Sequence, residues 1–494
     1  MLGPDFRNTI GVFTVMAMVA VAQVSTTQST INAGGQNSVN LINSQVRVDA
    51  PYSGSVPGMK ASEGVMQLSL KDAMERAMKY NLGAVQSTES LRIARGQRLT
   101  ALSALLPAVN GSIKEVVQQT DLAALGFKPS LFSGGGGVGG PNIPSVVGPY
   151  NYFDARATLN HAVADLYRIR TFRAATETAR AAEFTARDAR DLVALAVAGA
   201  YLQTTAAANR IQVAEAAVRT AEATYTQASD RLKAGLNARI DVTRTQVQLQ
   251  SEKQRLRGLQ ADLEKQKLTL ARVIGLALDQ EFVLTDAFAF EALPELTQAE
   301  ALTRAKADRA DVAAAQATMR AAEDRVKAIR AATLPSLSLQ ADYGLIGVNP
   351  AQSHGTFSVT GAINFPIYSG TRLKGESEQA GAALEQRRAQ YADVQGRVEF
   401  EVRQAFIDLN SAADQVALAS KNAELAADTL RQSQDRFGAG VADTVEVVQA
   451  QQTVVQANND LISATYEHNL AKIALARAAG QAEKTIPQYL KKGN

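Results

Sequence analysis

The stretch from Ser336 to Phe365 decides the fold, and it reads SLSLQADYGLIGVNPAQSHGTFSVTGAINF. Apolar residues occupy alternate positions at both of its ends, at Leu337, Leu339, Ala341, Tyr343 and Leu345 and again at Phe357, Val359, Ile363 and Phe365. Alternation with a period of two is typical of a β-strand with one apolar and one polar face. The sequence therefore predicts two strands, over residues 336–346 and 356–367.

The first half of the chain carries a second pair of strand signals. Apolar residues alternate with polar ones over residues 152–163, at Phe153, Ala155, Ala157, Leu159 and Val163. The preceding candidate strand, residues 108–119, alternates poorly: Val109 and Ile113 fit the pattern, but two adjacent valines follow. We therefore expect four strands, one pair in each half of the chain.

Short motifs return in the same order in the two halves. Leu105-Leu106-Pro107-Ala108 returns as Thr333-Leu334-Pro335-Ser336, a shift of 335 − 107 = 228 residues. Asp230-Arg231-Leu232-Lys233-Ala234-Gly235 returns as Asp435-Arg436-Phe437-Gly438-Ala439-Gly440, a shift of 435 − 230 = 205 residues. Ordered matches of this kind indicate an internal duplication. We predict two structural repeats, residues 63–290 and 291–481.

Helical hairpins are predicted after each strand pair, over residues 166–274 and 371–479, because an Ala-Gly turn divides each helical stretch in two. The first arm of each hairpin would be ~100 Å long at about 1.5 Å per residue. Steps of three and four residues mark a heptad seam of coiled-coil type, at Leu192, Leu195, Gly199, Leu202, Ala206, Asn209, Val213 and Ala216. Shorter helices are expected over residues 70–80, 83–105, 297–307 and 311–333.

The ends of the chain are predicted to lie outside this architecture. An apolar run from Ile10 to Ala22 ends in Ala-Val-Ala, which indicates an export signal peptide over residues 1–22. An uncleaved membrane anchor is the alternative. Residues 23–62 are rich in Ser, Thr, Asn, Gln and Gly and are expected to be flexible. Residues 482–494 are expected to form a C-terminal tail.

Composition argues against several classes of function. Lysine and arginine number 51 against 48 aspartates and glutamates, so no basic footprint for nucleic acid is expected. There is no cysteine, and His161, His354 and His468 lie far apart, so we expect no metal site. The Gly-rich run from Ser133 to Gly140 lacks the Gly-Lys-Ser/Thr of a phosphate-binding loop. We therefore expect no cofactor and no enzymatic activity.

The strands have the length that a bilayer requires when they are tilted, about ten residues. An open sheet of four strands would leave backbone groups unpaired in lipid, and the smallest transmembrane barrels have about eight strands. The chain is therefore expected to supply part of a barrel shared by two or more copies. A soluble β-sandwich is the alternative for the same four strands.

Several motifs together resemble the TolC-like outer-membrane efflux proteins. They are the two Leu-Pro junctions, Asn364-Phe365-Pro366-Ile367-Tyr368-Ser369-Gly370 before the second long helix, and the paired Arg-x-x-Ala-Gly turns. The turns are followed by Arg239-Ile240-Asp241-Val242 and by Thr444-Val445-Glu446-Val447. The resemblance covers about residues 63–481, nearly the whole mature chain.

This resemblance implies an α+β membrane protein of the bacterial outer membrane that extends into the periplasm. Four strands from each subunit of a homotrimer would close a 12-stranded barrel, and the antiparallel helices would form a periplasmic tunnel. Its implied function is passive efflux or secretion, coupled through a periplasmic adaptor, or membrane fusion protein, to an inner-membrane efflux pump or secretion transporter. The alternative is a periplasmic coiled-coil structural or adaptor protein.

Six candidate site residues follow from the same resemblance. Asp241 and Glu446 would form the periplasmic gate or constriction, and the tip turns with their adaptor contact would be Arg231, Gly235, Arg436 and Gly440. Each residue type also has a purely structural explanation. A carboxylate in the first turn of a helix favours the dipole, an arginine in the last turn does likewise, and glycine supplies a left-handed cap.

Overall fold

A computed structural model describes residues 50–56, 58, 64–126, 145–236, 238–286, 290–291 and 296–490. The chain divides after Gln45 into two units, and the described residues all belong to the second, Val46–Asn494. The predicted signal peptide, most of the predicted flexible segment at 23–62, and the Gly-rich run at 133–140 lie outside the described residues.

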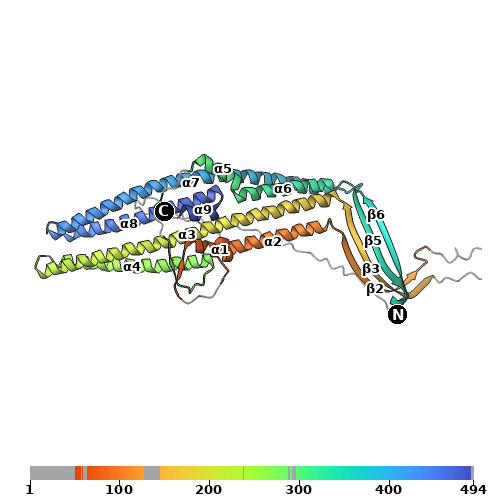
Figure 1. Ribbon diagram of the computed structural model, residues 1–494, viewed down its shortest axis with the longest axis horizontal. Coiled ribbons are helices and arrows are strands. Elements are labelled where there is room, and N and C mark those ends of the chain that lie inside the picture. The colour runs from red at the N-terminus through yellow and green to blue at the C-terminus, as the bar shows by residue number, and fades with distance from the viewer. Residues whose placement is uncertain are drawn as a thin grey trace, which may run out of the picture. The chain divides into compact units, whose positions relative to one another are not determined.

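Helices make up most of the described chain (Figure 1). The α-helices are α1 (Leu70–Tyr80), α2 (Leu82–Ser103), α3 (Leu166–Lys233), α4 (Arg239–Ile274), α5 (Gln298–Asp308), α6 (Ala310–Ala331), α7 (Arg372–Gly438), α8 (Thr444–Ala479) and α9 (Ala482–Tyr489). The strands are β1 (Met66–Leu68), β2 (Ala108–Asp121), β3 (Val146–Ala164), β4 (Phe282–Leu284), β5 (Ser336–Gly347) and β6 (Ser353–Asn364). Short 3-10 turns lie at Ala50–Ser53 and Pro350–Gln352.

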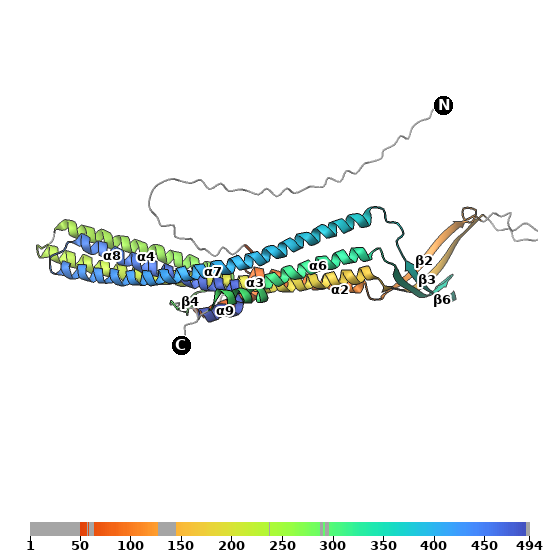
Figure 2. The same cartoon turned by 90° about the horizontal axis from the view of Figure 1, so that it is seen from above.

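The four long strands and the helices beside them follow one spatial order. The sheet has the order β2-β3-β5-β6, with every neighbouring pair antiparallel. Helix α2 runs into β2, β3 runs into α3, α6 runs into β5 and β6 runs into α7. These four helices pack in the same sequence, α2 on α3, α3 on α6 and α6 on α7. The helical layer therefore continues the sheet, and both end at an open edge on each side (Figures 1 and 2).

Each of the four long strands differs from its predicted range at one end or both, and β3 and β6 differ most. β3 begins at Val146 instead of residue 152, because its first residues pair with β2 alone, beyond the end of β5. Gly148 and Pro149 lie in that part and hide any alternation in the sequence. β6 ends at Asn364, opposite the first residue of β5, and Pro366 has no N–H to extend the ladder.

At the other end of the long helices, α3 packs on α4 and α7 packs on α8 as two hairpins that meet through α3 and α8. The buried seam of α3 in this part is a stripe of small residues one position beyond the predicted seam, at Ala207, Ala214, Ala221 and Ala228. In α7 the matching stripe is Ala405, Ala412, Ala419, Ala426 and Ser433. A small residue every seventh position lets neighbouring helices approach closely. The stripes correspond at the shift of 205 residues found for the turns, since 412 − 207 = 205.

In the middle of α3 the predicted seam residues Gly199, Leu202 and Ala206 are buried, but burial there extends around the whole helix. Residues 193–202 are nearly all buried, and Tyr201 donates a hydrogen bond of 2.8 Å from its hydroxyl to the Leu68 carbonyl. α1, α9 and the small β1–β4 sheet enclose this part of the helix. α3 is long and apolar enough to cross a membrane, but 67% of its most apolar window is buried inside the protein.

Two segments predicted to be irregular pack against this central core. In the segment 23–62, which was predicted to be flexible, the Tyr52 carbonyl accepts a hydrogen bond of 2.7 Å from Asn81 Nδ2. Ser55 forms an isolated antiparallel β-bridge with Asn81. In the predicted tail, α9 buries Ala482 and Ile486 completely. Both segments are short, so tertiary contacts stabilise them instead of any strong local pattern.

A network of charged residues connects the helices around the core. Arg309, at the break between α5 and α6, donates hydrogen bonds of 2.7 Å to Asp311 and 2.5 Å to Glu401. Arg477 of α8 donates one of 2.5 Å to Asp188 of α3. Burial raises the pKa of Asp188, while the nearby Arg477 opposes that shift. Removing one partner of such a buried pair leaves an uncompensated charge, so we expect each to be needed for the helix arrangement.

Candidate functional site

The two hairpin turns are built alike, and glycine makes each of them possible. Gly235 has a φ of +74° and Gly440 a φ of +78°, the left-handed region that side chains with a Cβ disfavour. After each turn the backbone N–H groups bond back to the ending helix, Leu236 to the Arg231 carbonyl at 2.8 Å and Val441 to the Arg436 carbonyl at 3.0 Å. This is the Schellman arrangement, which satisfies the last carbonyls of α3 and α7.

Arg231 connects the first turn to the second. Its Nη2 donates a hydrogen bond of 2.7 Å to the carbonyl of Gly438, and its guanidinium lies 4.6 Å from the centroid of the Phe437 ring. Both partners belong to the end of α7. Arg231 therefore does more than balance the dipole of α3, because it fixes the two turns against each other.

Asp241 and Thr444 make a second contact between the hairpins. The Thr444 hydroxyl donates a hydrogen bond of 2.9 Å to Asp241 Oδ1, so the first turn of α4 is held to the first turn of α8. Thr444 is 1% exposed. Arg244 lies 3.7 Å from the same carboxylate oxygen. Asp241 is thus both a first-turn carboxylate and a partner across the hairpins.

Glu446 has its partner within its own hairpin. Its Oε1 lies 3.3 Å from Nε of Arg436, which lies in the last turn of α7. Its backbone N–H donates a hydrogen bond of 3.0 Å to the side chain of Asp443, the residue that caps α8. Both side chains of the Arg436–Glu446 pair are substantially exposed, so the ion pair is weak by itself.

The structure thus gathers all six candidate residues at one end of the hairpins, and it adds Thr444, Asp443 and Phe437. The run Asp443-Thr444-Val445-Glu446 has the pattern of a helix start, with a capping residue followed three positions later by an acid. That pattern could have identified Asp443 from the sequence. Thr444 and Phe437 are recognised only through their partners on the other hairpin.

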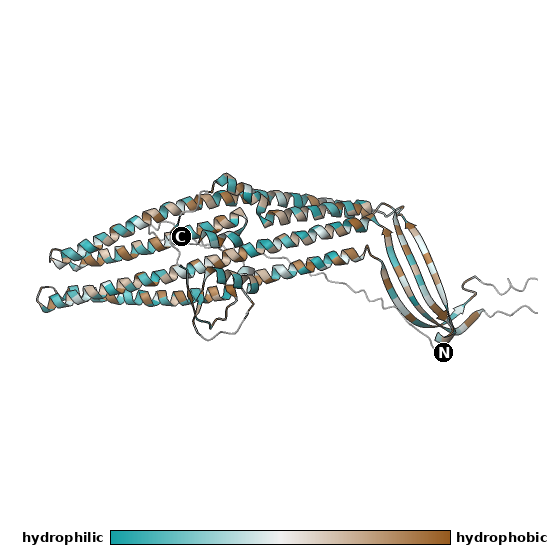
Figure 3. Cartoon of the chain, in the orientation of Figure 1, coloured by the Kyte–Doolittle hydropathy of each residue, from teal (hydrophilic) through white to brown (hydrophobic). Residues whose placement is uncertain are grey.

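The second candidate surface is the four-stranded sheet, along whose strands hydrophobic and hydrophilic residues follow one another (Figure 3). Cross-strand register places a set of large apolar residues on one face, all exposed: Val109, Ile113, Val117, Tyr343, Leu345, Phe357, Val359 and Ile363. Ile113 is 78% exposed and Phe357 is 77% exposed. No described segment covers this face, and the described strands form no second sheet over it, so the soluble β-sandwich is wrong.

The opposite face of the sheet carries charged residues near its middle. Arg156 lies 3.2 Å from an oxygen of Asp154 and also pairs with Asp342 on the neighbouring strand. Lys114 is the cross-strand partner of Asp154. Two basic and two acidic side chains therefore share one face, next to Thr and Asn residues. Most of the large apolar residues lie on the other face, which also carries Glu115.

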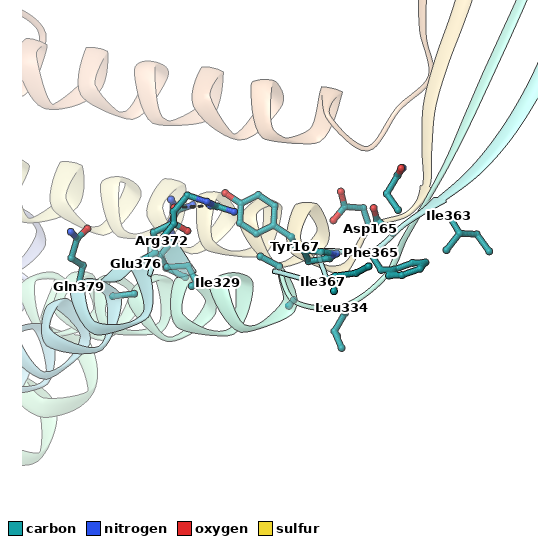
Figure 4. Close-up of a pocket in the computed structure, with 17 residues that line it drawn as sticks. Asp165, Tyr167, Ile329, Leu334, Ile363, Phe365, Ile367, Arg372, Glu376 and Gln379 are labelled. Atoms are coloured by element: carbon teal, nitrogen blue, oxygen red, sulfur yellow. Dashed lines mark hydrogen bonds and ion pairs between the residues drawn. The ribbon is translucent and has the colours of Figure 1, made fainter. Parts of the chain in front are cut away.

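A broad open pocket of about 1040 Å³ lies where the sheet meets the helices (Figure 4). Phe365 and Ile367 line it from the segment after β6, and Ile367 and the adjacent Tyr368 are among the most exposed side chains described. On the helical side, Arg372 donates a hydrogen bond of 2.9 Å to Glu376. Exposed apolar and aromatic residues thus form a border between the apolar face of the sheet and the charged helices.

Among the described residues, no group of three or more His, Cys, Asp or Glu side chains could hold a metal ion. His161 lies on β3, His354 lies on β6 and His468 lies on α8.

Comparison with known proteins agrees with this architecture. The sequence profile of the family described as "Outer membrane efflux protein" matches residues 86–276 and 301–481. The pyoverdine export outer membrane protein OpmQ of Pseudomonas putida is 26% identical over 304 residues, which are 58% of this chain and 61% of that protein. The outer membrane efflux protein BepC of Brucella suis is 28% identical over 257 residues, 51% of this chain and 55% of its own length.

The chain therefore aligns with only somewhat more than half the length of these two relatives. The structural similarity to known proteins covers more of the chain. The crystal structure of the Campylobacter jejuni CmeC outer membrane channel superposes with a TM-score of 0.71 at 17% identity, over 90% of this chain and 95% of that one.

Proposed function

The chain belongs to the outer membrane efflux protein family, and from this premise we propose that it is a passive trimeric channel for efflux or secretion. It is a protein of the outer membrane whose helices extend into the periplasm. Because members of this family are efflux channels, we assign no enzymatic reaction to it. Energy would come from an inner-membrane pump or secretion transporter.

One observation carries the proposal. The described sheet has an uncovered face with many large apolar residues, and its edge strands β2 and β6 are each paired on one side only. Exposed residues such as Ile113, Phe357 and Val359 are suited to lipid and not to water. A sheet can remain in lipid only if its edges are closed, since unpaired backbone groups are costly there. We infer that copies of the chain pair β2 of one subunit with β6 of the next.

We propose three copies, and hence a barrel of 12 strands. Two copies would give about eight strands, the lower limit for such barrels, whose interior is filled by side chains. The charged face of the sheet would then line the lumen. The family resemblance of the motifs points to a trimer as well. The same arrangement would join the open edges of the helical layer, α2 and α7, into a tunnel.

We propose that the tip of the hairpins is the gate of this tunnel. The contacts Arg231–Gly438 and Asp241–Thr444 both run between the α3–α4 and α7–α8 hairpins, so both oppose their separation. Glu446 would contribute charge at the constriction, because its partner Arg436 lies in the same hairpin and does not restrain opening.

The periplasmic adaptor would dock at the same tip. Leu236 and Val441, which directly follow the two turn glycines, are both well exposed. Two exposed apolar residues beside Arg231 and Arg436 form a surface suited to a protein partner. The repeats at 63–290 and 291–481 would explain why the two turns present this surface twice.

The proposal is tested by single-channel conductance of the purified protein in a planar bilayer. Asp241→Ala and Thr444→Val each remove a hydrogen bond to a charged group, about 1.5–3 kcal/mol, so the open population should rise about tenfold or more. Asp262→Asn, an exposed carboxylate on the same helix, is the matched control and should conduct as the wild type does. A stable trimer that never conducts in any variant would contradict a gated channel.

The periplasmic structural or adaptor protein remains the alternative outcome. Such a protein would leave the cell envelope in high salt, whereas a barrel requires detergent because its apolar face is in contact with lipid. Extraction followed by a measurement of size separates the two.

A further inference from the structure

A cavity of about 510 Å³ lies between the two hairpins, away from the turns. Its walls come from α3, α4, α7 and α8, including Val213 and Gln248 from the first hairpin and Leu430 and Val455 from the second. Its volume falls in the range of small-molecule sites, about 300–1,000 Å³. Its lining combines apolar residues with amide, hydroxyl and carboxylate side chains.

Glu252 is the one charged residue among those that line this cavity. Its side chain is 7% exposed. One carboxylate oxygen accepts a hydrogen bond of 2.7 Å from Gln248 Nε2, and the other, Oε2, is buried without a hydrogen-bond partner among the described residues. A buried carboxylate oxygen of this kind is costly unless a donor or a cation satisfies it.

The polar residues near Glu252 do not supply that donor. Gln248 is already engaged, since its Oε1 accepts a hydrogen bond of 3.2 Å from Gln452. Gln451 donates across the cavity wall to Thr224 Oγ1 at 2.6 Å. The neighbouring cation Lys253 lies 3.8 Å from Glu222 and does not line the cavity.

We propose that this cavity is a binding site for a small organic ammonium ion with an apolar body. The ammonium group would donate to Glu252 Oε2, and the apolar body would lie against Val213, Leu430 and Val455. A second cavity, of about 540 Å³, shares Asn209 and Ile462 with the first and adds Phe290 and Tyr466. An aromatic or longer aliphatic body therefore has room beyond the charged end.

Occupation of the site would favour the closed arrangement of the hairpins. All four helices surround the ligand only when the hairpins lie together, and a ligand stabilises the state that it binds better. This consequence for gating rests on the proposed function, whereas binding itself does not.

The experiment is a calorimetric titration of the full-length protein in detergent with phenethylammonium. We expect saturable binding of one ion per chain. Glu252→Gln should weaken it tenfold or more, because the charged hydrogen bond is lost while the shape of the side chain is kept. Glu264→Gln, an exposed carboxylate on the same helix, should leave the affinity unchanged. Phenethyl alcohol, the neutral analogue, should bind weakly and equally to all three proteins.

A second variant tests the cavity without touching the charge. Ala216→Phe projects from α3 into the space and should abolish binding while Glu252 remains. Three results would each overturn the proposal. They are equal affinity of the wild type and Glu252→Gln for the ion, uptake of the ion into detergent that does not saturate, and loss of binding in Glu446→Gln instead of Glu252→Gln. Conductance separates the two proposals: a protein that binds the ion but never conducts retains the site and loses the proposed function.

Discussion

At the scale of single residues, the two hairpin turns show how one substitution changes the role of a shared motif. The turns read Asp-Arg-Leu-Lys-Ala-Gly and Asp-Arg-Phe-Gly-Ala-Gly, so their arginines occupy equivalent places. Arg231 nevertheless reaches the other hairpin, because the second turn offers the Phe437 ring and the Gly438 carbonyl. The first turn has Leu232 and Lys233 at the corresponding positions, and Arg436 pairs with Glu446 of its own hairpin.

We predict that Arg231→Met loosens the contact between the turns. The variant loses a cation–π contact and a hydrogen bond, together about 1–2 kcal/mol, so local opening should become about tenfold more frequent. Hydrogen exchange of the Gly440 and Val441 amides measures this directly. Arg436→Met is the matched control. Equal exchange rates of these amides in the two variants would show that Arg231 does not stabilise the contact between the two hairpins.

His468 is expected to make the protein sensitive to acid. Burial, together with the nearby Lys472, lowers the pKa of His468 from 6.5 to about 4. Because the unfolded chain binds this proton more readily than the folded one, the associated stability is complete above pH 6.5 and is lost as the pH falls toward 4. Between pH 6.5 and pH 5 the loss should be about 2 kcal/mol.

Thermal unfolding in detergent at those two pH values tests this expectation. His468→Gln cannot titrate, so its unfolding midpoint should fall less between the two pH values than that of the wild type. An equal fall in both proteins would assign the acid sensitivity to other groups. Burial raises the pKa of Asp188 and Asp191. Protonation of these two carboxyl groups therefore favours the folded state as the pH falls, which opposes the effect of His468.

At the scale of elements, small residues at every seventh position allow the long helices to pack. Ala214, Ala221 and Ala228 are almost fully buried in α3, and Ala412, Ala419 and Ala426 follow the same spacing in α7. Alanine loses little side-chain entropy in a helix and keeps neighbouring backbones close. The low aromatic content of 5% is therefore consistent with long helices that pack through small side chains.

We predict that Ala221→Leu destabilises the first hairpin by about 1–3 kcal/mol, because the added atoms have no space in the seam. The thermal midpoint in detergent should fall accordingly. Ala223→Leu places the same side chain at an exposed position two residues further along α3 and should leave the midpoint unchanged. If the two variants melted alike, the stripe would not be the packing surface.

At the scale of the whole molecule, the described chain is an incomplete structure. Its described sheet ends at β2 and β6, and its described helical layer ends at α2 and α7, so both leave open edges that further copies would join in the proposed trimer. None of the described residues covers the apolar face of the sheet. In the proposed function, assembly with further copies and contact with lipid would complete the fold.

A pair of neighbouring substitutions in β6 tests which face meets lipid. Val359→Arg places a charge on the apolar face, which should cost about 2–4 kcal/mol near the middle of a bilayer and reduce assembly in the membrane. Thr360→Arg places the same charge on the opposite face and should assemble normally, with altered ion selectivity. The amount of trimer extracted from membranes by detergent measures both, and a reversed order would place the lipid on the other face.

The sequence alone determined the local structure of the chain. Alternation located β3, β5 and β6, sustained helical periodicity located the long helices, and glycine after an arginine-containing last turn located both hairpin turns. The alternation of β2 was poor, and β1 and β4 were not predicted. These features depend on neighbours within a few residues, which is why period and turn chemistry report them. The same local signals, in order, also pointed to the outer membrane efflux protein family, to which the sequence profile assigns the chain.

Only the tertiary structure decided which helices and strands pack against one another and which residues that packing buries. The predicted seam lay one position from the buried stripe at Ala207, because the face that a helix buries depends on where its partner lies. Residues 482–489 form α9 for the same reason, since its two buried side chains pack on the central core. The pairing of β3 with β5 and the contact of Arg231 with the second turn each join residues about 200 positions apart in the sequence. The unpartnered oxygen of Glu252 lies in a cavity between helices of the two hairpins. Such non-local contacts leave no periodic trace in the sequence.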